Sequence, residues 1–379
     1  MISAFAFERR HIHQTCAVWP KSEKGEERIK VTELKKLFEP TTIGNIELKN
    51  RLVMLGIGTH FGENDRVSQR LREFNLERAR GGVGLISLGT LYPADLGQPE
   101  EGNLGIYHDK FIPELRQLTD DIHGYDVRVT AQLLLRYQWR SGKAASLEYV
   151  APSALVTGPA IKMPRELNID EIQQIVEQFG DAARRSREAG FDAADICCIA
   201  GYLINRFLSP CTNKRQDEYG GSLENRMRLL LEIIESAQKN AGADYPLICR
   251  LSFDDFMRDG INIEDSQKTA VRLQEAGIKC LIMYAGWHEC PVPTTQASVS
   301  EGAFVNMAEE IKKVVDIPVV AANRINDPVL ADQIIADGKA DLIGMARALI
   351  ADPELPNKAR EGRLDDIRPC ICCNRCLEL

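Results

Sequence analysis

The sequence predicts an α/β protein folded as a (β/α)8 TIM barrel. Short β-branched runs alternate with amphipathic helical stretches from Leu37 onward, the alternation gives eight units, and no change in composition divides them. Such alternation indicates a parallel sheet covered by helices. Eight units favour a closed barrel because closure leaves no edge strand. An open α/β sheet with a similar count of units is the alternative.

Each unit is predicted from a run of apolar residues followed by a helical pattern. In 170–189, for example, Ile172, Ile175, Val176 and Phe179 recur at the spacing of one helix face. The predicted strands are Leu52–Leu55, Val83–Leu88, Val127–Leu135, Ala193–Ile199, Leu247–Phe253, Lys279–Tyr284, Val319–Ala322 and Asp341–Met345. The helices that follow them are predicted at Gln69–Arg80, Pro113–His123, Asp170–Ala189, Asn225–Lys239, Glu264–Ala276, Phe304–Val315, Val329–Ala336 and Leu355–Glu361.

The length and composition fit one large domain with short additions at both ends. The chain has 379 residues, of which 44% are apolar and 27% charged, and a barrel needs about 250 residues. We therefore expect an N-terminal extension at residues 1–36, the barrel at 37–366 and a cysteine-rich segment at 367–379.

The charge balance and the cysteine usage restrict partners and location. The formal net charge is −8, which argues against nucleic acid or an anionic membrane as a partner. No apolar run reaches the ~18–20 residues that span a bilayer. Eleven scattered cysteines do not form the even, dense pattern of a disulfide framework, so we expect a cytoplasmic protein.

Two turns that follow the last two predicted strands combine small residues with an arginine. They read Ala321-Ala322-Asn323-Arg324 and Ile343-Gly344-Met345-Ala346-Arg347. Small residues let the backbone approach an anion, and the arginine neutralises it. In a TIM barrel this position is a common phosphate site, which the two turns together predict. Ordinary loops with surface arginines are the alternative.

Four further polar side chains lie in or just after predicted strands. Gln132 and Arg250 interrupt apolar strands, where a cation is costly unless paired. A flavin ring would use both, although a structural ion pair and a core amide are equally simple explanations. Tyr202 and His288 follow the fourth and sixth strands and could donate a proton to a carbanion, or be structural.

The end of the chain carries four cysteines within seven residues. Cys370, Cys373 and Cys376 have the C-x2-C-x2-C spacing, which wraps one corner of a [4Fe–4S] cluster. A cubane needs a fourth ligand, and the sequence ends at Leu379 without one. Zinc and exposed thiols without a metal are the alternatives.

Longer stretches resemble the Old Yellow Enzyme superfamily of NADH:flavin oxidoreductases. The resemblance covers about Leu37 to Cys376 and is carried by 37–40, 43–51, 201–210, 212–215, 217–222 and 224–226. Within the superfamily, Gly286-Trp287-His288-Glu289 and residues 323–328 are similar to bacterial 2,4-dienoyl-CoA reductase. The cysteine spacing is nearer to trimethylamine dehydrogenase, an iron–sulfur flavoprotein relative.

The resemblance implies an FMN site, a proton-donor pair and a metal cluster. It assigns Gln132 and Arg250 to the isoalloxazine ring, Arg324, Met345, Ala346 and Arg347 to the phosphate, Gly58 and Gly89 to loops that approach the flavin, Tyr202 and His288 to proton donation, and Cys370, Cys373 and Cys376 to the cluster.

The activity implied by the resemblance is that of an ene-reductase. It would transfer a hydride from reduced FMN to an α,β-unsaturated or dienoyl acyl-CoA or acid, with NAD(P)H as the ultimate electron donor. The long relatives continue with FAD and NAD(P)H modules and supply the fourth cysteine. We therefore expect this chain to be a truncated part of a longer protein; a separate electron-donor module, direct reduction by NAD(P)H and a homo-oligomer remain open.

The sequence departs from the superfamily at three positions. Cys197 and Ala200 stand where a polar pair binds the substrate carbonyl, and Leu135 replaces a histidine near the flavin. Two alternatives to the ene-reductase stay open, and these departures favour the second of them. One is an amine dehydrogenase of the trimethylamine dehydrogenase type, and the other is a truncated protein that binds FMN without turnover.

Overall fold

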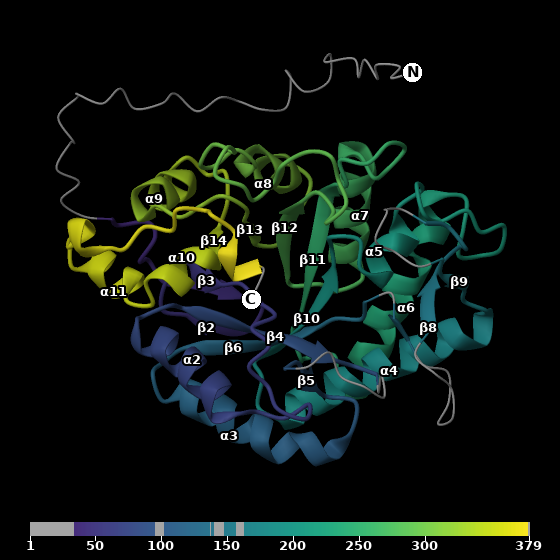
Figure 1. Cartoon of the computed structure of the whole chain (residues 1–379), viewed down its shortest axis with the longest axis horizontal. Helices are drawn as coiled ribbons and strands as arrows, with labels where there is room; N and C mark the ends of the chain where they lie inside the picture. The colour runs from purple at the N-terminus through teal and green to yellow at the C-terminus, as the bar shows by residue number, and fades with distance from the viewer. Residues whose placement is uncertain (1–33, 95–101, 137, 140–147, 157–162, 378–379) are drawn as a thin grey trace.

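The computed structural model describes residues 34–94, 102–136, 138–139, 148–156 and 163–377 (Figure 1). Most of the expected N-terminal extension, residues 1–36, lies outside the described residues, as do the last two residues of the cysteine-rich segment.

Eight parallel strands close into a barrel, which confirms the predicted fold. In order around the barrel they are β3 (Leu52–Met54), β4 (Leu85–Tyr92), β6 (Arg128–Leu133), β10 (Ala193–Cys198), β11 (Leu247–Asp254), β12 (Cys280–Ala285), β13 (Val319–Ala321) and β14 (Leu342–Met345). The barrel closes because β3 pairs with both β14 and β4. Spatial order equals sequence order, as expected of repeated right-handed β–α units.

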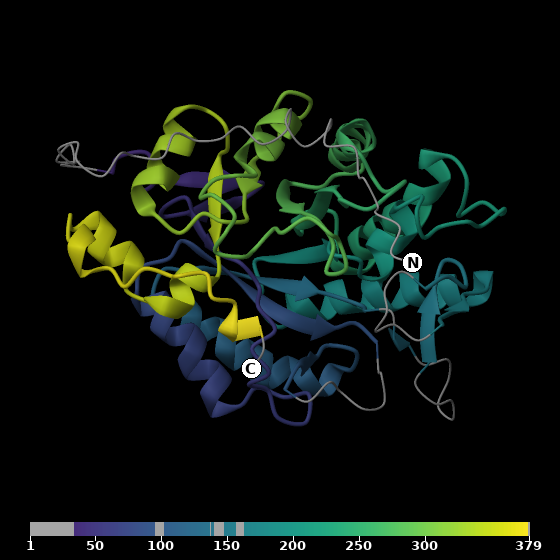
Figure 2. The ribbon, with the colours of Figure 1, turned by 45° about the horizontal axis from the view of Figure 1, so that its top comes forward.

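Helices surround the barrel on its outer face (Figures 1 and 2). They are α2 (Gln69–Arg80), α3 (Ile112–His123), α4 (Ile169–Glu188), α5 (Leu203–Leu208), α6 (Leu223–Ala241), α7 (Ile263–Glu275), α8 (Val305–Lys312), α9 (Pro328–Ala336), α10 (Arg347–Ala351) and α11 (Leu355–Arg360), with short 3-10 turns η1 (Asp109–Phe111), η2 (Leu364–Asp366) and η3 (Arg375–Leu377). Helix α4 begins with a capping box between Asn168 and Glu171. It buries Ile172, Ile175 and Phe179, the face that the sequence pattern predicts.

Several short elements are additions that the periodicity does not predict. They are β1 (Thr41–Ile43), β2 (Ile46–Leu48), β5 (Leu104–Gly105), β7 (Gln138–Trp139), β8 (Glu148–Ala151), β9 (Arg165–Glu166) and the helices α5 and α10. Strands β1 and β2 form an antiparallel hairpin. Ile43, Ile46 and Leu48 of this hairpin pack against inward-facing residues at the amino ends of the barrel strands. The hairpin therefore closes the amino end of the barrel.

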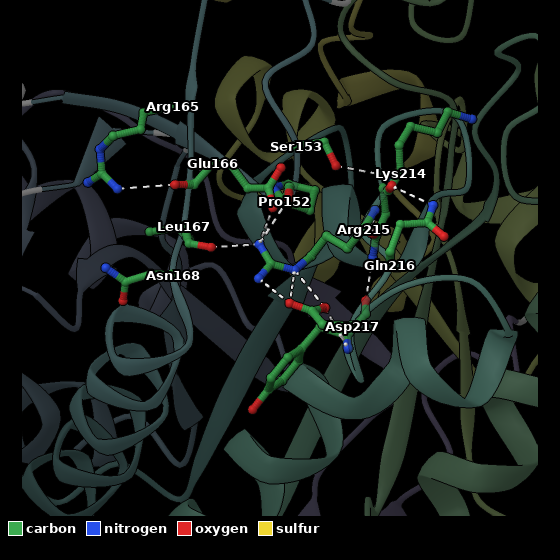
Figure 3. A network of polar contacts seen from close by, with 12 residues as sticks. Pro152, Ser153, Arg165, Glu166, Leu167, Asn168, Lys214, Arg215, Gln216 and Asp217 are labelled. Carbon is green, nitrogen blue, oxygen red and sulfur yellow. Dashed lines mark hydrogen bonds and ion pairs between the residues drawn. The ribbon is translucent and has the colours of Figure 1, made fainter.

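A buried arginine ties the β7–β9 sheet to the long loop between α5 and α6 (Figure 3). The Arg215 guanidinium donates hydrogen bonds to the carbonyl oxygens of Pro152 and Leu167, at 3.1 and 2.6 Å, and pairs with Asp217 at 2.6 Å. Because the Arg215 charge is neutralised and its donors are used, burial of the side chain is tolerated. This network fixes the sheet against the loop between α5 and α6.

Among the described residues, none of the helices is both long enough and apolar enough to cross a lipid bilayer.

Candidate functional site

A cavity of about 250 Å3 opens at the carboxyl ends of the barrel strands. All eight strands, or the loops that follow them, contribute to its lining. The lining consists of Leu55, Gly56, Ile57, Gly58, Thr90, Gln132, Leu134, Ile199, Ala200, Tyr202, Arg250, Tyr284, His288, Thr295, Asn323, Arg324, Ile325, Asn326, Gly344, Ala346, Arg347, Ala348, Ile350, Cys370, Cys372 and Cys376. TIM-barrel active sites lie at this face.

A second hollow, of about 490 Å3, lies at the amino end of the barrel. Several of its charged groups are paired with one another or with neighbours: Arg187 binds Asp244 at 2.7 Å, and Asp192 contacts His123 at 2.8 Å. Its position is opposite to the end of a TIM barrel where active sites lie. We therefore place the functional site at the carboxyl end.

The floor of the cavity contains a buried ion pair. The Arg250 guanidinium lies 2.7 Å from the Asp195 carboxylate and donates a hydrogen bond of 2.6 Å to Ser87. Arg250 also lines the cavity. The sequence left two alternatives for Arg250, a structural ion pair and a cation that binds a ligand. The structure shows the ion pair with Asp195, and Arg250 also faces the cavity, so both roles are compatible with its position.

Glycines pack against the Gln132 amide beside Arg250. A Cβ atom would lie 2.4 Å from the Gln132 Oε1 atom at Gly56 and 1.9 Å from it at Gly89, so neither position accepts a side chain without displacing the amide. Gly89 therefore supports the site from beside Gln132 and is outside the cavity lining. At Gly58 the nearest atom would be 3.8 Å away, which leaves room for a ligand to approach the backbone.

The two predicted phosphate turns lie side by side on the paired strands β13 and β14. Asn323 and Arg324 both have positive φ, at 65° and 57°, a sharp reversal that turns their side chains into the cavity lining. Ala346 and Arg347 line the cavity from the neighbouring turn. Met345 does not, because its side chain is buried in the core.

Two amide oxygens in this region are acceptors without donors. The Oδ1 atoms of Asn323 and Asn326 are buried and accept no hydrogen bond within the described residues. Burial without a partner is costly. A ligand that carries hydroxyl groups would satisfy these oxygens.

Tyr202 and His288 meet above the cavity. The Tyr202 hydroxyl lies 3.1 Å from the His288 Nε2 atom, and the two rings pack edge to face. Burial raises the pKa of the Tyr202 phenol well above its ordinary value. The surrounding protein partly excludes water from the His288 ring, which keeps an exposed edge, and this lowers the pKa of His288; Arg136 and Arg206 lower it further, and Glu289 opposes them. Both groups are therefore neutral at neutral pH, with a proton on the tyrosine oxygen.

Cys197, within β10, and Ala200, just after it, stand where the resemblance expects a polar pair for the substrate carbonyl. Cys197 is buried, with its sulfur 3.7 Å from the Gln132 Nε2 atom, and burial raises the thiol pKa to about 12. Ala200 lines the cavity with a methyl group only. Neither side chain offers the polar contact that the superfamily uses for a substrate carbonyl.

The cysteine-rich segment runs from α11 back toward the centre of the barrel (Figures 1 and 2). Cys370 and Cys376 line the cavity, and Cys373 does not; Cys373 and Cys376 are both exposed. In the parts of the chain that the structure describes, no three histidine, cysteine or acidic side chains are arranged to hold a metal ion. The predicted cluster ligands thus remain a prediction.

The segment instead contacts the predicted phosphate arginines. Arg324 donates to the sulfur of Cys372, which is buried, and Arg347 donates to Asn374 at 2.7 Å. Cys372 lies outside the three-cysteine spacing, so the sequence pattern did not single it out.

Sequence reasoning also missed several residues that support the site. Asp195 and Asp255 are acidic residues in or just after buried strands, and this polarity within an apolar run was the available signal. Thr295 and Asn326 lie in loops, and no local sequence pattern shows that their side chains turn toward the cavity.

Known proteins with several different activities are similar to this chain in sequence or in fold. The model of the NADH:flavin oxidoreductase / NADH oxidase family matches residues 36–366. A metal reductase of Desulforamulus reducens is 41% identical over 90% of this chain and 51% of its own length. A cinnamate reductase of Clostridium sporogenes is 33% identical over 90% of this chain and 55% of its own.

Solved structures agree with this relationship. A complex of 2-naphthoyl-CoA reductase with 2-naphthoyl-CoA superposes with a TM-score of 0.86 at 34% identity, covering 90% of this chain and 54% of that one. Histamine dehydrogenase from Rhizobium sp. 4-9 gives a TM-score of 0.80 at 30% identity, covering 91% and 50%. The chain thus spans about half the length of these relatives. With its closed barrel, its matching residues and these similarities, the chain belongs to the NADH:flavin oxidoreductase / NADH oxidase family.

Proposed function

We propose that the chain is the FMN-binding barrel of an ene-reductase that reduces α,β-unsaturated or dienoyl acyl-CoA thioesters or the corresponding acids. The observation that carries this proposal is the contact between Tyr202 and His288 above a cavity whose floor is Gln132 and Arg250.

The donors and acceptors of the cavity fit FMN. Gln132 and Arg250 would hold the polar edge of the flavin ring, Asn323 and Asn326 have acceptor oxygens left for ribityl hydroxyls, and Arg324 and Arg347 would neutralise the phosphate. When bound, FMN supplies the hydride, with NAD(P)H as the ultimate donor. Arg250 places a positive charge where a reduced flavin ring would carry a negative one.

The residues of the chain supply the proton. Tyr202 is the donor because burial keeps its phenol protonated, and hydride addition leaves a carbanion that needs a proton. The His288 ring, whose Nε2 atom lies 3.1 Å from the phenol oxygen, restores the proton: its Nε2–H passes to the tyrosinate while Nδ1 takes a proton from water, so the ring ends neutral. General acid catalysis of this kind contributes about 10²–10⁴-fold in rate.

The names of two relatives support the substrate class. One reduces cinnamate, an unsaturated acid, and the other binds and reduces an aromatic acyl-CoA. At Cys197 and Ala200 this chain lacks the polar pair for a simple enone carbonyl. An acyl substrate would therefore be held by contacts elsewhere.

Single-turnover kinetics test the proposal. The FMN-loaded protein is reduced with dithionite without oxygen and mixed with cinnamate, cinnamoyl-CoA or a 2,4-dienoyl-CoA, and flavin absorbance is followed. We expect reoxidation by at least one of them, much faster than that of free reduced FMN. If none of these acceptors reoxidises the flavin, the ene-reductase proposal is wrong.

Amine oxidation is the second candidate, favoured by the similarity to histamine dehydrogenase. The same protein in its oxidised form separates the two. Bleaching of the oxidised flavin by histamine or trimethylamine would support an amine dehydrogenase. A flavin that responds to neither class of compound would indicate FMN binding without turnover.

A further inference from the structure

Behind the Tyr202–His288 pair lies a buried carboxylate that takes no direct part in the cavity. Asp255 follows β11 and has no exposed surface. Its Oδ2 atom accepts hydrogen bonds from the Ser209 hydroxyl at 2.6 Å and the Ile261 backbone N–H at 3.0 Å. Its Oδ1 atom accepts from the Trp287 indole N–H at 2.5 Å and the Asn205 amide at 3.4 Å. Four donors, from helix α5, its C-cap residue and the loops after β11 and β12, thus converge on one side chain.

One branch of this network leads to Tyr202. The Asn205 Oδ1 atom accepts a hydrogen bond of 2.8 Å from the backbone N–H of Gly201, the residue before Tyr202. Gly201 has a φ of 81°, and Arg206 donates to its carbonyl oxygen at 2.6 Å. Both sides of the Gly201 peptide are therefore fixed by α5, the helix that Asp255 holds.

The other branch leads to His288 through Trp287. The Trp287 ring lies against Gly201, where a Cβ atom would be 2.9 Å from the ring, and the Arg206 guanidinium lies 5.0 Å above that ring. The backbones of Ala200 and Trp287 form a β-bridge. A displacement of the Trp287 ring would therefore move His288 relative to Tyr202.

We propose that Asp255 is a positioning residue, which sets the contact between Tyr202 and His288 by holding Asn205 and the Trp287 indole. The inference rests on the proposed function, because it assigns Asp255 a role in the proton transfer of that reaction. Asp255 itself touches neither substrate nor flavin.

The substitution Asp255→Asn tests this inference with almost no change in volume. In either orientation of the new amide, its NH2 group faces a group that can only donate, either the Trp287 indole N–H or the Ile261 backbone N–H. Trp287→Phe removes the same hydrogen bond from the other side and keeps an aromatic ring. Asp254→Asn is the matched control, because this neighbouring carboxylate caps the Phe256 N–H at 2.7 Å and does not contact Trp287.

Kinetics in two backgrounds separate positioning from general damage. We expect Asp255→Asn and Trp287→Phe to slow substrate-dependent flavin reoxidation by about ten- to hundredfold, because misplacement by about 1 Å costs that much. FMN affinity should stay within about twofold. In a Tyr202→Phe background the same changes should have almost no effect, because residues that act as a unit are not additive. Asp254→Asn should react like the parent protein.

A second readout needs no substrate. The NMR titration of His288, assigned with His288→Gln, reports the surroundings of its ring. Partial exclusion of water and the charges of Glu289, Arg136 and Arg206 shift its pKa. Loss of the Asp255 charge alone would lower the His288 pKa, so a midpoint that rises in Asp255→Asn would reflect a displaced ring. We expect the midpoint to rise toward its ordinary value.

The outcomes are distinct. The inference is overturned if Asp255→Asn leaves both the rate and the His288 titration unchanged, or slows the Tyr202→Phe protein as much as the parent. If Asp255→Asn does not fold, Trp287→Phe decides by the same measurements. If the parent protein reduces no acceptor, the proposed function fails, and the His288 titration still decides whether Asp255 positions the pair.

Discussion

Removing Asp195 should destabilise the barrel strongly, because it leaves the Arg250 cation buried without its counter-charge. The exposed fractions of the two side chains are 0% for Asp195 and 4% for Arg250. Arg250 donates to a single Asp195 oxygen through both Nε, at 2.8 Å, and Nη2, at 2.7 Å. Of the hydrogen bonds described for this guanidinium, Asp195→Ala keeps only the one to the Ser87 hydroxyl, at 2.6 Å.

The expected magnitude follows from this geometry. Breaking a buried ion pair by removing one partner costs about 3–5 kcal/mol, whereas replacing both partners with apolar groups costs much less. We therefore expect Asp195→Ala to lower the free energy of unfolding by about 3–5 kcal/mol. The double variant Asp195→Ala/Arg250→Met should recover most of that loss, since no unpaired charge is left inside the barrel.

Urea denaturation followed by circular dichroism measures the effect. The matched control is Asp244→Ala, which breaks the exposed pair of Asp244 with Arg187 and should leave stability almost unchanged because surface pairs contribute little. The reasoning is refuted if Asp195→Ala loses less than about 1 kcal/mol. It is also refuted if the double variant is no more stable than the single one.

Three further predictions concern two residues of the cavity and the buried carboxylate of Asp255 behind it. Tyr202→Phe should slow flavin reoxidation by about 10²-fold or more while the absorbance of bound FMN is retained; release of the flavin would mean that Tyr202 is structural. Arg347→Ala should weaken FMN binding by roughly ten- to hundredfold, because a hydrogen bond to a charged group contributes about 1.5–3 kcal/mol; an unchanged Kd in a fluorescence titration would remove Arg347 from the phosphate site. Burial raises the pKa of Asp255 to about 6, so the rate should fall as pH decreases through that value, when protonation removes an acceptor from Trp287. The titratable groups that interact electrostatically with Asp255 are Cys211 after α5 and Cys198 on β10. The pKa of Asp255 in the folded protein lies above its ordinary value of 3.8. Protonation of Asp255 therefore favours folding at low pH, and this contribution is lost as pH rises to about 6. A lower rate at low pH should therefore not result from unfolding caused by Asp255. A rate independent of pH from 5 to 7 would contradict this assignment.

The sequence was sufficient to predict the barrel because its strands and helices are strongly periodic. The predicted helix Gln69–Arg80 coincides with α2, and the predicted strand Val127–Leu135 contains β6 with one extra residue before it and two after it. The shorter elements are different. Helix α5 has six residues, all buried, and no side-chain cap. Its formation depends on packing, which no local pattern encodes.

The candidate site was predictable where the barrel topology alone brings residues together. Tyr202 and His288 each follow a strand, and strand ends converge, so their contact follows from the fold. The supporting residues could not be predicted in the same way. The partner of Arg250 is Asp195 on the adjacent strand. The donors to Asp255 come from the short helix α5 and from loops whose conformations depend on one another. The hydrogen-bond partners of Arg250 and Asp255 are therefore known only from the folded structure.

The pairing of β3 with β14 has a consequence for how the protein folds. Val53 lies opposite Gly344, so the ladder that completes the sheet joins residues almost 300 positions apart in a chain of 379. Contacts this distant in sequence form slowly, because the loop entropy is lost before the contact is gained. During synthesis, one edge of β3 stays unpaired until β14 has been synthesised, and exposed strand edges favour aggregation. Deleting β14 should therefore yield an insoluble protein rather than a smaller stable barrel.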